Sequence, residues 1–185
     1  LLIAFLGIIF SNRNIHGKLL ILQIPLFFAH FWVVLPTFEL ADRLRQLPLR
    51  QAAELILNSK KRNEPLVMVG AMKPSIHFYT QEIIVFEGRS ENAFVNVSDR
   101  LRKEKRRGWE GRPIYGLNGS KTALLLIDKR SVEKWYWKGL NPKILGGFGV
   151  YSVWRVDREN IEGRAETLES QGVKPTWHIP RPERF

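Results

Sequence analysis

The sequence contains no cysteine, which excludes disulfide bonds, thiolate nucleophiles and cysteine-bound metal sites. The sequence has no Gly-x-x-x-x-Gly-Lys loop to cradle a phosphate, and Ser75 follows Lys73-Pro74 instead of standing in a Gly-x-Ser-x-Gly turn. Its histidines are scattered and form no metal-ligand spacing with the carboxylates: they are His16, His30, His77 and His178. A self-contained enzyme is therefore not expected within these residues.

Acidic residues are in the minority, and the 29 Lys and Arg against 18 Asp and Glu give a formal net charge of +11. Such an excess favours an anionic partner, which could be nucleic acid, lipid headgroups or a phosphorylated substrate. The basic residues are spread over the whole chain and no aromatic–basic recognition motif accompanies them. We therefore expect no nucleic-acid partner.

The chain opens at Leu1 on a ten-residue apolar run, without the charged lead and cleavage site of a secretory signal peptide. We interpret it as a piece of a longer protein. Residues 19–36 contain no Asp, Glu, Lys or Arg and are just long enough for a membrane-spanning helix. The sequence thus predicts two transmembrane helices within 1–36, the first of them truncated. A buried helix of a soluble protein is the alternative.

The short loop between these two apolar segments carries Arg13, His16 and Lys18. The positive-inside rule places such a loop in the cytoplasm, so residues from Thr37 onward would emerge on the opposite side of the membrane. This topology also argues against nucleic acid as a partner.

Beyond the apolar segments we expect an interfacial linker over 37–47, an extracytoplasmic domain over 48–172 and a proline-rich tail over 173–185. Apolar periodicity predicts helices over 49–59, 90–107, 131–140 and 158–170, the third of them capped by Ser131. Strands are predicted over 66–69, 83–86 and 122–129, with one or two more within 142–158. This alternation is typical of an α/β sandwich with a mostly parallel sheet.

The densest charge feature is RLRKEKRR, residues 100–107. On a helix Arg102, Lys105 and Arg106 would share one face, while Leu101 would point to the core. That face could contact lipid headgroups or a lipid-linked phosphate. The alternative is a solvated helix face.

The stretch EPLVMVGAMKPSIHFYTQEIIVFEG, residues 64–88, follows a helix with the sequence LPLRQAAELI. Together they resemble the C-terminal region of bacterial membrane glycosyltransferases, in particular the aminoarabinose-transferase-like members of the protein O-mannosyltransferase superfamily, in the version common in cyanobacteria. TALLLID (122–128) and YSVWRV (151–156) add weaker support.

The resemblance implies that the full-length protein has a GT-C membrane domain in the bacterial inner membrane. It would transfer a hexosyl or pentosyl group from a polyprenyl-phosphate donor to a lipid or protein acceptor, with membrane lipid as a further partner. The catalytic carboxylate, and a divalent metal if one is used, would lie in an N-terminal part. This fragment would then hold no catalytic residue and no cofactor, and would act as a periplasmic lid or support that is inactive alone.

Under this resemblance Lys73, His77 and Tyr79 become candidate substrate-binding residues, because ligands of open α/β sheets meet the carboxyl ends of strands. Lys73 would contact a phosphate, and His77 or Tyr79 a sugar. The alternative is structural, with Ser75 capping a short helix and Phe78-Tyr79 packing on the sheet.

Two competing functions stay open. One is a membrane-anchored extracytoplasmic binding or assembly module without catalytic activity. The other is a free-standing nucleotide-binding enzyme, which would need the glycine loop that the sequence lacks. The sugar, the acceptor and the oligomeric state do not follow from the sequence.

Overall fold

The computed structural model describes residues 7, 23–24, 26–103, 106–107, 113–114 and 120–179. The chain divides into two units, residues 1–47 and 48–185, and each is described by itself. The second unit is built on a five-stranded sheet with the order β2-β1-β5-β7-β6. Its strands are β1 (Leu66–Val69), β2 (Ile84–Glu87), β5 (Thr122–Asp128), β6 (Lys143–Phe148) and β7 (Tyr151–Asp157).

The sheet is mixed, so the prediction of a mostly parallel sheet is wrong. Strand β1 pairs in parallel with β2 and with β5, whereas β7 pairs antiparallel with both β5 and β6. The cause is the hairpin that joins β6 to β7, in which Gly149 takes a φ of +56°. The hairpin folds β7 back into the position beside β5, and a strand that returns through a tight turn must run antiparallel to the strand before it.

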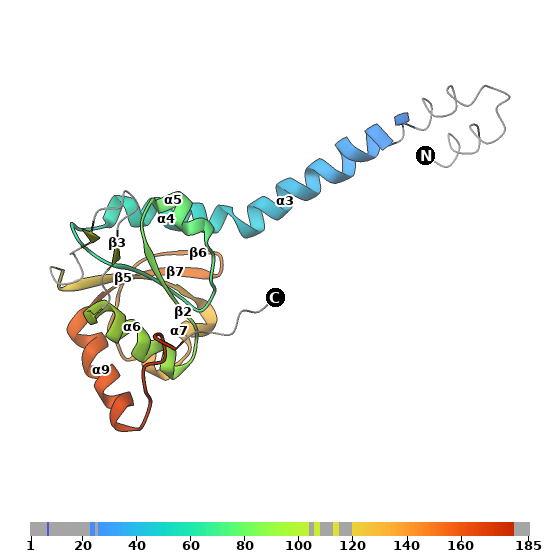
Figure 1. Ribbon diagram of the computed structural model, residues 1–185. Coiled ribbons are helices and arrows are strands. Elements are labelled where there is room, and N and C mark those ends of the chain that lie inside the picture. Colours follow the sequence, from blue (N-terminus) through green and yellow to red (C-terminus); the bar gives the residue numbers. More distant parts are fainter. Residues whose placement is uncertain are drawn as a thin grey trace. The chain divides into compact units, whose positions relative to one another are not determined.

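Helices cover both faces of this sheet (Figure 1). The helices α4 (Leu47–Ser59) and α5 (Ser75–Thr80) lie on one face, and α6 (Glu91–Lys103) and α9 (Arg158–Ser170) lie on the other. Because side chains alternate along a strand, Leu66 and Met68 of β1 join the α4 core, while Val67 and Val69 join the α6 core. Strand β5 is buried on both faces from Ala123 to Asp128, as its continuous apolar run predicts.

The helix α6 begins where the Ser90 hydroxyl accepts a hydrogen bond from the Ala93 backbone N–H at 3.2 Å. It ends at Lys103, four residues before the predicted end at Arg107. Residues Arg106–Arg107 instead form β3, which pairs antiparallel with β4 (Pro113–Ile114).

The predicted helix over 131–140 is in fact two short helices, α7 (Lys129–Val132) and α8 (Trp135–Lys138). Ser131 does not cap it, because the capping residue is Asp128, whose carboxylate accepts the Ser131 backbone N–H at 2.8 Å. Ser131 is itself buried within α7. The last helix, α9, has the predicted bounds.

In the first unit a five-residue π-helix, η1 (His30–Val34), continues into α3 (Leu35–Arg45). None of the residues in these two elements is buried. Arg43 and Glu39, one turn apart on α3, form an exposed ion pair at 2.6 Å. Such an exposed pair contributes about 0.5 kcal/mol at most to helix stability.

The prediction of two transmembrane helices is corrected by this geometry. In the part of the chain that the structure describes, no helix is both long enough and apolar enough to cross a membrane. Residues 26–36 would rise only about 16 Å, roughly half of a hydrocarbon core, before the charged residues Glu39, Asp42 and Arg43 follow on α3. Residues 1–6, 8–22 and 25, which include most of the first predicted span and the start of the second, lie outside the described residues.

Candidate functional site at the carboxyl edge of the sheet

Strands β1, β2 and β5 are mutually parallel, so their carboxyl ends meet at one edge of the sheet. The chain leaves β1 through α5 toward β2, and β5 lies on the other side of β1. This divergence makes the β1–β5 boundary a topological switch point, which is where open α/β sheets usually bind ligands. Glu87 ends β2 and Asp128 ends β5 at this edge, and Gly70 directly follows β1.

The carboxylate of Asp128 occupies the switch point, next to Gly70. Gly70 follows β1 with a φ of +92°, and a Cβ atom at this position would lie 2.5 Å from Asp128 Oδ1. The other carboxylate oxygen, Oδ2, accepts Arg89 Nε at 2.9 Å, and Arg89 Nη2 contacts the same oxygen. The Tyr136 hydroxyl in turn donates to the Arg89 carbonyl. Glycine is thus required here by its conformation and by the close approach of a carboxylate.

This pair is ionised at neutral pH. Burial raises the pKa of Asp128, but the hydrogen bonds from Arg89 and Ser131 outweigh it and hold that pKa below its ordinary value. The hydrogen bond to Asp128 raises the pKa of Arg89 in return.

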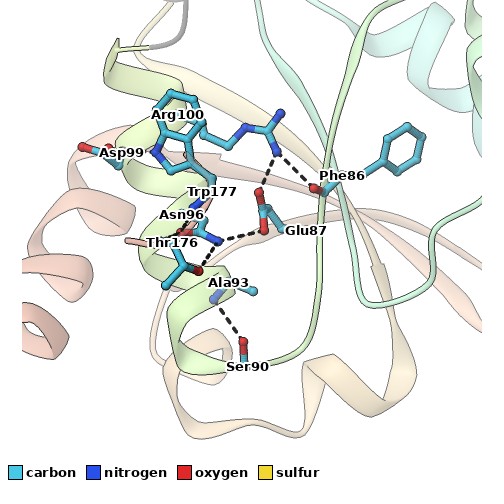
Figure 2. Close-up of polar contacts among 9 residues, drawn as sticks. All are labelled: Phe86, Glu87, Ser90, Ala93, Asn96, Asp99, Arg100, Thr176 and Trp177. Atoms are coloured by element: carbon cyan, nitrogen blue, oxygen red, sulfur yellow. Dashed lines mark hydrogen bonds and ion pairs between the residues drawn. The ribbon is translucent and has the colours of Figure 1, made fainter. Parts of the chain in front are cut away.

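A second carboxylate, Glu87 at the end of β2, is completely buried. Arg100 Nη1 donates to Glu87 Oε1 at 2.6 Å and also to the Phe86 carbonyl at 3.1 Å. Asn96 Nδ2 donates to Glu87 Oε2 at 3.1 Å. Figure 2 shows that Asn96 and Arg100 reach Glu87 from the same side of α6, one turn apart. Both carboxylate oxygens therefore have partners.

Residues 59–172 of this chain match the family model of the cyanobacterial RgtA-type glycosyltransferase, C-terminal domain. The chain belongs to this family. The resemblance drawn from the stretch between Leu66 and Phe86 is thereby confirmed. None of the curated proteins and none of the solved structures matches the chain. The matched region of the RgtA-type domain runs from the end of α4 to the turn after α9, and so holds all five strands of the main sheet and the carboxyl-edge carboxylates.

In the RgtA-type domain the predicted substrate-binding residues lie on or next to α5, and they do not converge on one point. Lys73 is exposed in the loop between β1 and α5. His77 turns toward β2, where its Nδ1 lies 2.6 Å from the Glu82 carbonyl oxygen and its ring packs edge-on against Phe86. Tyr79 turns toward α4, where Arg50 Nε donates to its hydroxyl at 3.3 Å. Lys73 is thus the most accessible of the three predicted residues.

The structural alternative for this segment holds in part. A short helix does begin at Ser75, and Tyr79 packs against the core on the α4 face of the sheet. Pro74 occupies the N-cap position and no side chain caps the helix, so Ser75 is not the cap. Phe78 does not pack on the sheet, because 79% of it is exposed.

Of the three predicted lipid-contacting residues, Arg102 and Arg106 do not share a helical face, because α6 ends at Lys103. Arg102 is exposed on the last turn of α6 and pairs with Asp99 at 3.2 Å. Lys105 lies outside the described residues, and Arg106 belongs to β3.

Sequence reasoning missed the carboxyl-edge residues Glu87, Asp128, Arg89, Asn96 and Arg100. A usable signal was present for two of them, since Glu87 and Asp128 each stand at the end of an apolar strand. The same rule that singled out the residues after β1 applies to the ends of β2 and β5.

The buried carboxylates of the described residues all have cationic partners. Glu64 pairs with Arg155, Glu87 with Arg100, Asp99 with Lys103 and Asp128 with Arg89. Within the described ranges, no three His, Asp or Glu side chains gather to hold a metal ion. A carboxylate tied to a guanidinium or ammonium group is a poor general base.

Proposed function

We propose that this chain is the C-terminal part of a glycosyltransferase that uses a polyprenyl-phosphate sugar donor, and that its RgtA-type domain is a lid and support for a catalytic part elsewhere in the protein. The observation that carries the lid role is the pairing of every buried carboxylate among the described residues. A transferase needs an unpaired acid or base near the sugar, and these residues offer stability instead. The chain alone would then be inactive.

The donor class, a hexosyl or pentosyl group on polyprenyl phosphate, is supported by the sequence resemblance and by the net charge of +11. A basic domain attracts an anionic lipid-linked phosphate and the surface of an anionic membrane. The same resemblance supports a position on the periplasmic side of the bacterial inner membrane, with a lipid or a protein as the acceptor.

The surface proposed to contact the catalytic part consists of the loop after β1 and helix α5, here called the α5 surface. Phe78 is 79% exposed and Met72 is 56% exposed on it, and the exposed Lys73 stands next to Met72 in the chain. Exposed large apolar side chains are candidates for a protein contact, and a neighbouring cation would attract an anionic group. Phe78 and Met72 would pack on the catalytic part while Lys73 contacts the donor phosphate.

His77 and Tyr79 have supporting positions in this proposal. The contact of His77 Nδ1 with the Glu82 carbonyl requires a proton on Nδ1, and in the neutral imidazole Nε2 would then be an acceptor for a sugar hydroxyl. Tyr79 ties α5 to α4 through Arg50, so its effect on the substrate would pass through the position of α5.

The test uses the full-length enzyme and compares Phe78→Asp with Val150→Asp. Val150 is 57% exposed in the turn between β6 and β7, and so serves as a matched control outside the α5 surface. We expect Phe78→Asp to reduce sugar transfer at least about tenfold, equivalent to about 1.4 kcal/mol. Its melting temperature should stay that of the wild type, and Val150→Asp should change neither. Equal activity of both variants would remove the lid role of the α5 surface.

Lys73→Ala, again in the full-length enzyme, tests the phosphate contact separately. We expect a higher KM for the polyprenyl-phosphate donor with a smaller change in kcat, because a lost ground-state contact affects binding first. A full-length protein that transfers no sugar from any such donor would favour the non-catalytic binding or assembly module.

A further inference from the structure

Residues 173–179, here called the strap, leave the end of α9 and cross α6 without forming a helix or strand. The turn into the strap uses Gly172 at a φ of +93°, and the Val173 backbone N–H donates to the Leu168 carbonyl at 3.1 Å. The side chain of Val173 packs against the core, and the residues beyond it are held by side chains of α6.

Asn96 is the centre of this attachment. Its Oδ1 accepts the consecutive backbone N–H groups of Thr176 and Trp177, at 2.6 and 3.1 Å. Its Nδ2 donates to Glu87 Oε2 at 3.1 Å and to the Thr176 hydroxyl at 3.4 Å. An asparagine amide has two acceptor and two donor positions, and here all four are used (Figure 2). Asn96 therefore recognises the backbone of the strap as well as one of its side chains.

Trp177 is the anchor of the strap. Its indole Nε1 donates to Asp99 Oδ2 at 2.9 Å, and the Arg100 guanidinium carbon lies 5.9 Å from the ring centroid. Asp99 is buried on α6 and is held from its other side by Lys103 at 2.7 Å. Two turns before Asp99 on the helix, Asn92 Nδ2 donates to the Lys174 carbonyl at 3.0 Å. The contacts with the strap thus span about two turns of α6.

The strap lies just beyond the matched family region that binds it. The matched family region ends at residue 172, directly before the strap, whereas Glu87, Asn96, Asp99 and Arg100 all lie within that region. None of the described residues from 173 to 179 belongs to the buried core. Asn96 and Asp99, in contrast, are buried and polar, and each would lose its hydrogen bonds from the strap if nothing occupied the strap's place.

We propose that α6 and the end of β2 form a binding site for an extended peptide that contains a Thr-Trp pair, and that the strap is its exchangeable resident ligand, bound in cis. In this site Asn96 accepts two consecutive backbone N–H groups of the peptide, and Asp99 accepts the indole N–H. Arg100 lies over the face of the aromatic ring. A segment of another protein with the same pair could replace the strap. This site does not depend on the proposed sugar transfer.

The direct test uses the chain truncated after Gly172 and a labelled synthetic peptide of residues 172–180 added in trans. We expect saturable binding by fluorescence anisotropy, and about tenfold weaker binding or worse after Asn96→Leu in the chain or Trp177→Ala in the peptide. Asn160→Ala is the matched control, because Asn160 also donates a side-chain hydrogen bond to a carbonyl, that of Leu140, from α9. A folded truncated chain that does not bind the peptide would overturn the proposal.

A second measurement uses the full chain, so that the proposal is still tested if the truncated chain fails to fold. Chymotrypsin cleavage after Trp177, followed by mass spectrometry of the released C-terminal peptide, reports how often the strap opens. We expect cleavage at least about tenfold faster in Asn96→Leu than in wild type, and no change in Asn160→Ala. Equal cleavage rates in the wild type, Asn96→Leu and Asn160→Ala would overturn the proposed binding site. A dimer whose straps are protected from cleavage would instead show that the strap binds to a second chain.

Discussion

The two edges of the sheet bury carboxylates in different ways. At the amino edge Glu64, two residues before the start of β1, accepts two hydrogen bonds from Arg155 of β7, at 2.7 and 2.9 Å. Thr122 at the start of β5 donates to the same carboxylate, and Arg155 also donates to the Ser59 carbonyl at the end of α4. One bidentate pair thus joins four elements. At the carboxyl edge the carboxylates pair with arginines from the segments that follow β2, and one cluster continues into the strap.

We expect the amino-edge pair to contribute to the stability of the domain, and the carboxyl-edge clusters to hold a segment that can be exchanged. Burial raises the pKa of Glu64, but the hydrogen bonds from Arg155, the Lys61 backbone and Thr122 outweigh it and lower that pKa overall. The amino-edge pair has both partners fixed in or beside strands. The carboxyl-edge clusters use loops, one helix face and a segment outside the matched domain. We expect changes at the amino edge to unfold the domain and changes at the carboxyl edge to release parts of it.

The largest expected effect comes from Arg155→Met, which leaves Glu64 buried without its cation. We expect the free energy of unfolding to fall by about 3–5 kcal/mol, measured by urea denaturation of the full chain. Lys143→Met is the control, because Lys143 is exposed and lies beside Arg155 in the β6–β7 register. It should change stability by about 0.5 kcal/mol at most. A similar loss in both variants would contradict the central role of the amino-edge pair.

Next in size is Gly70→Ala at the carboxyl edge. The new Cβ would meet Asp128 Oδ1 at 2.5 Å in a left-handed conformation, so we expect a loss of about 3 kcal/mol from strain and displacement of the carboxylate. Gly163→Ala on α9 is the control, because a Cβ there meets nothing within 4 Å. That change should stabilise the chain by about 0.5–1 kcal/mol, since alanine favours a helix. Opposite signs for the two variants are the decisive result.

The elements of the domain could be predicted from the sequence because their signals are local. Apolar runs predicted β1, β2 and β5, and one or two further strands were predicted within 142–158, where the structure has β6 and β7. One difference has a long-range cause, because the antiparallel direction of β7 depends on its pairing with β5. The cap of α7 is local instead: Asp128 at the end of β5 accepts the backbone N–H of Ser131, three residues further on.

The carboxyl-edge site was harder to predict for the same reason. Asn96 and Thr176 are 80 residues apart, and no local pattern says that a proline-containing tail will cross α6. The polar residues Asn96 and Asp99 do stand among the apolar residues of α6, which hints at a buried polar contact. The identity of the partner became visible only in the folded chain.

A smaller effect is expected from Trp177→Phe, which keeps an aromatic ring but removes the indole N–H that Asp99 accepts. We expect a loss of about 1 kcal/mol in the free energy of unfolding, and a few-fold faster chymotrypsin cleavage of the strap. Trp135→Phe on α8 is the control, because Trp135 is 47% exposed and stacks with Arg164 at 5.5 Å through its ring face. Equal effects of the two substitutions would mean that Asp99 does not anchor the strap.

The smallest effect concerns acid stability, and it compares the two edges directly. The pKa values of Glu64 and Asp99 are lowered from 4.5 and 3.8, although burial alone would raise both, because hydrogen bonds from Arg155 and from Lys103 respectively outweigh it. A lowered carboxyl pKa adds stability above its unfolded value, and this is lost as the pH falls through the folded value.

Wild-type stability should therefore decline below about pH 4.5. Trp177→Phe removes one of the hydrogen bonds that lower the Asp99 pKa, so its unfolding free energy should decline less steeply with acid than that of the wild type. Urea denaturation at several pH values between 5 and 2 measures both slopes. Identical slopes would mean that Glu64 at the amino edge and Asp128 cause the loss of stability in acid. The contact between Asp99 and the strap would then make no contribution to it.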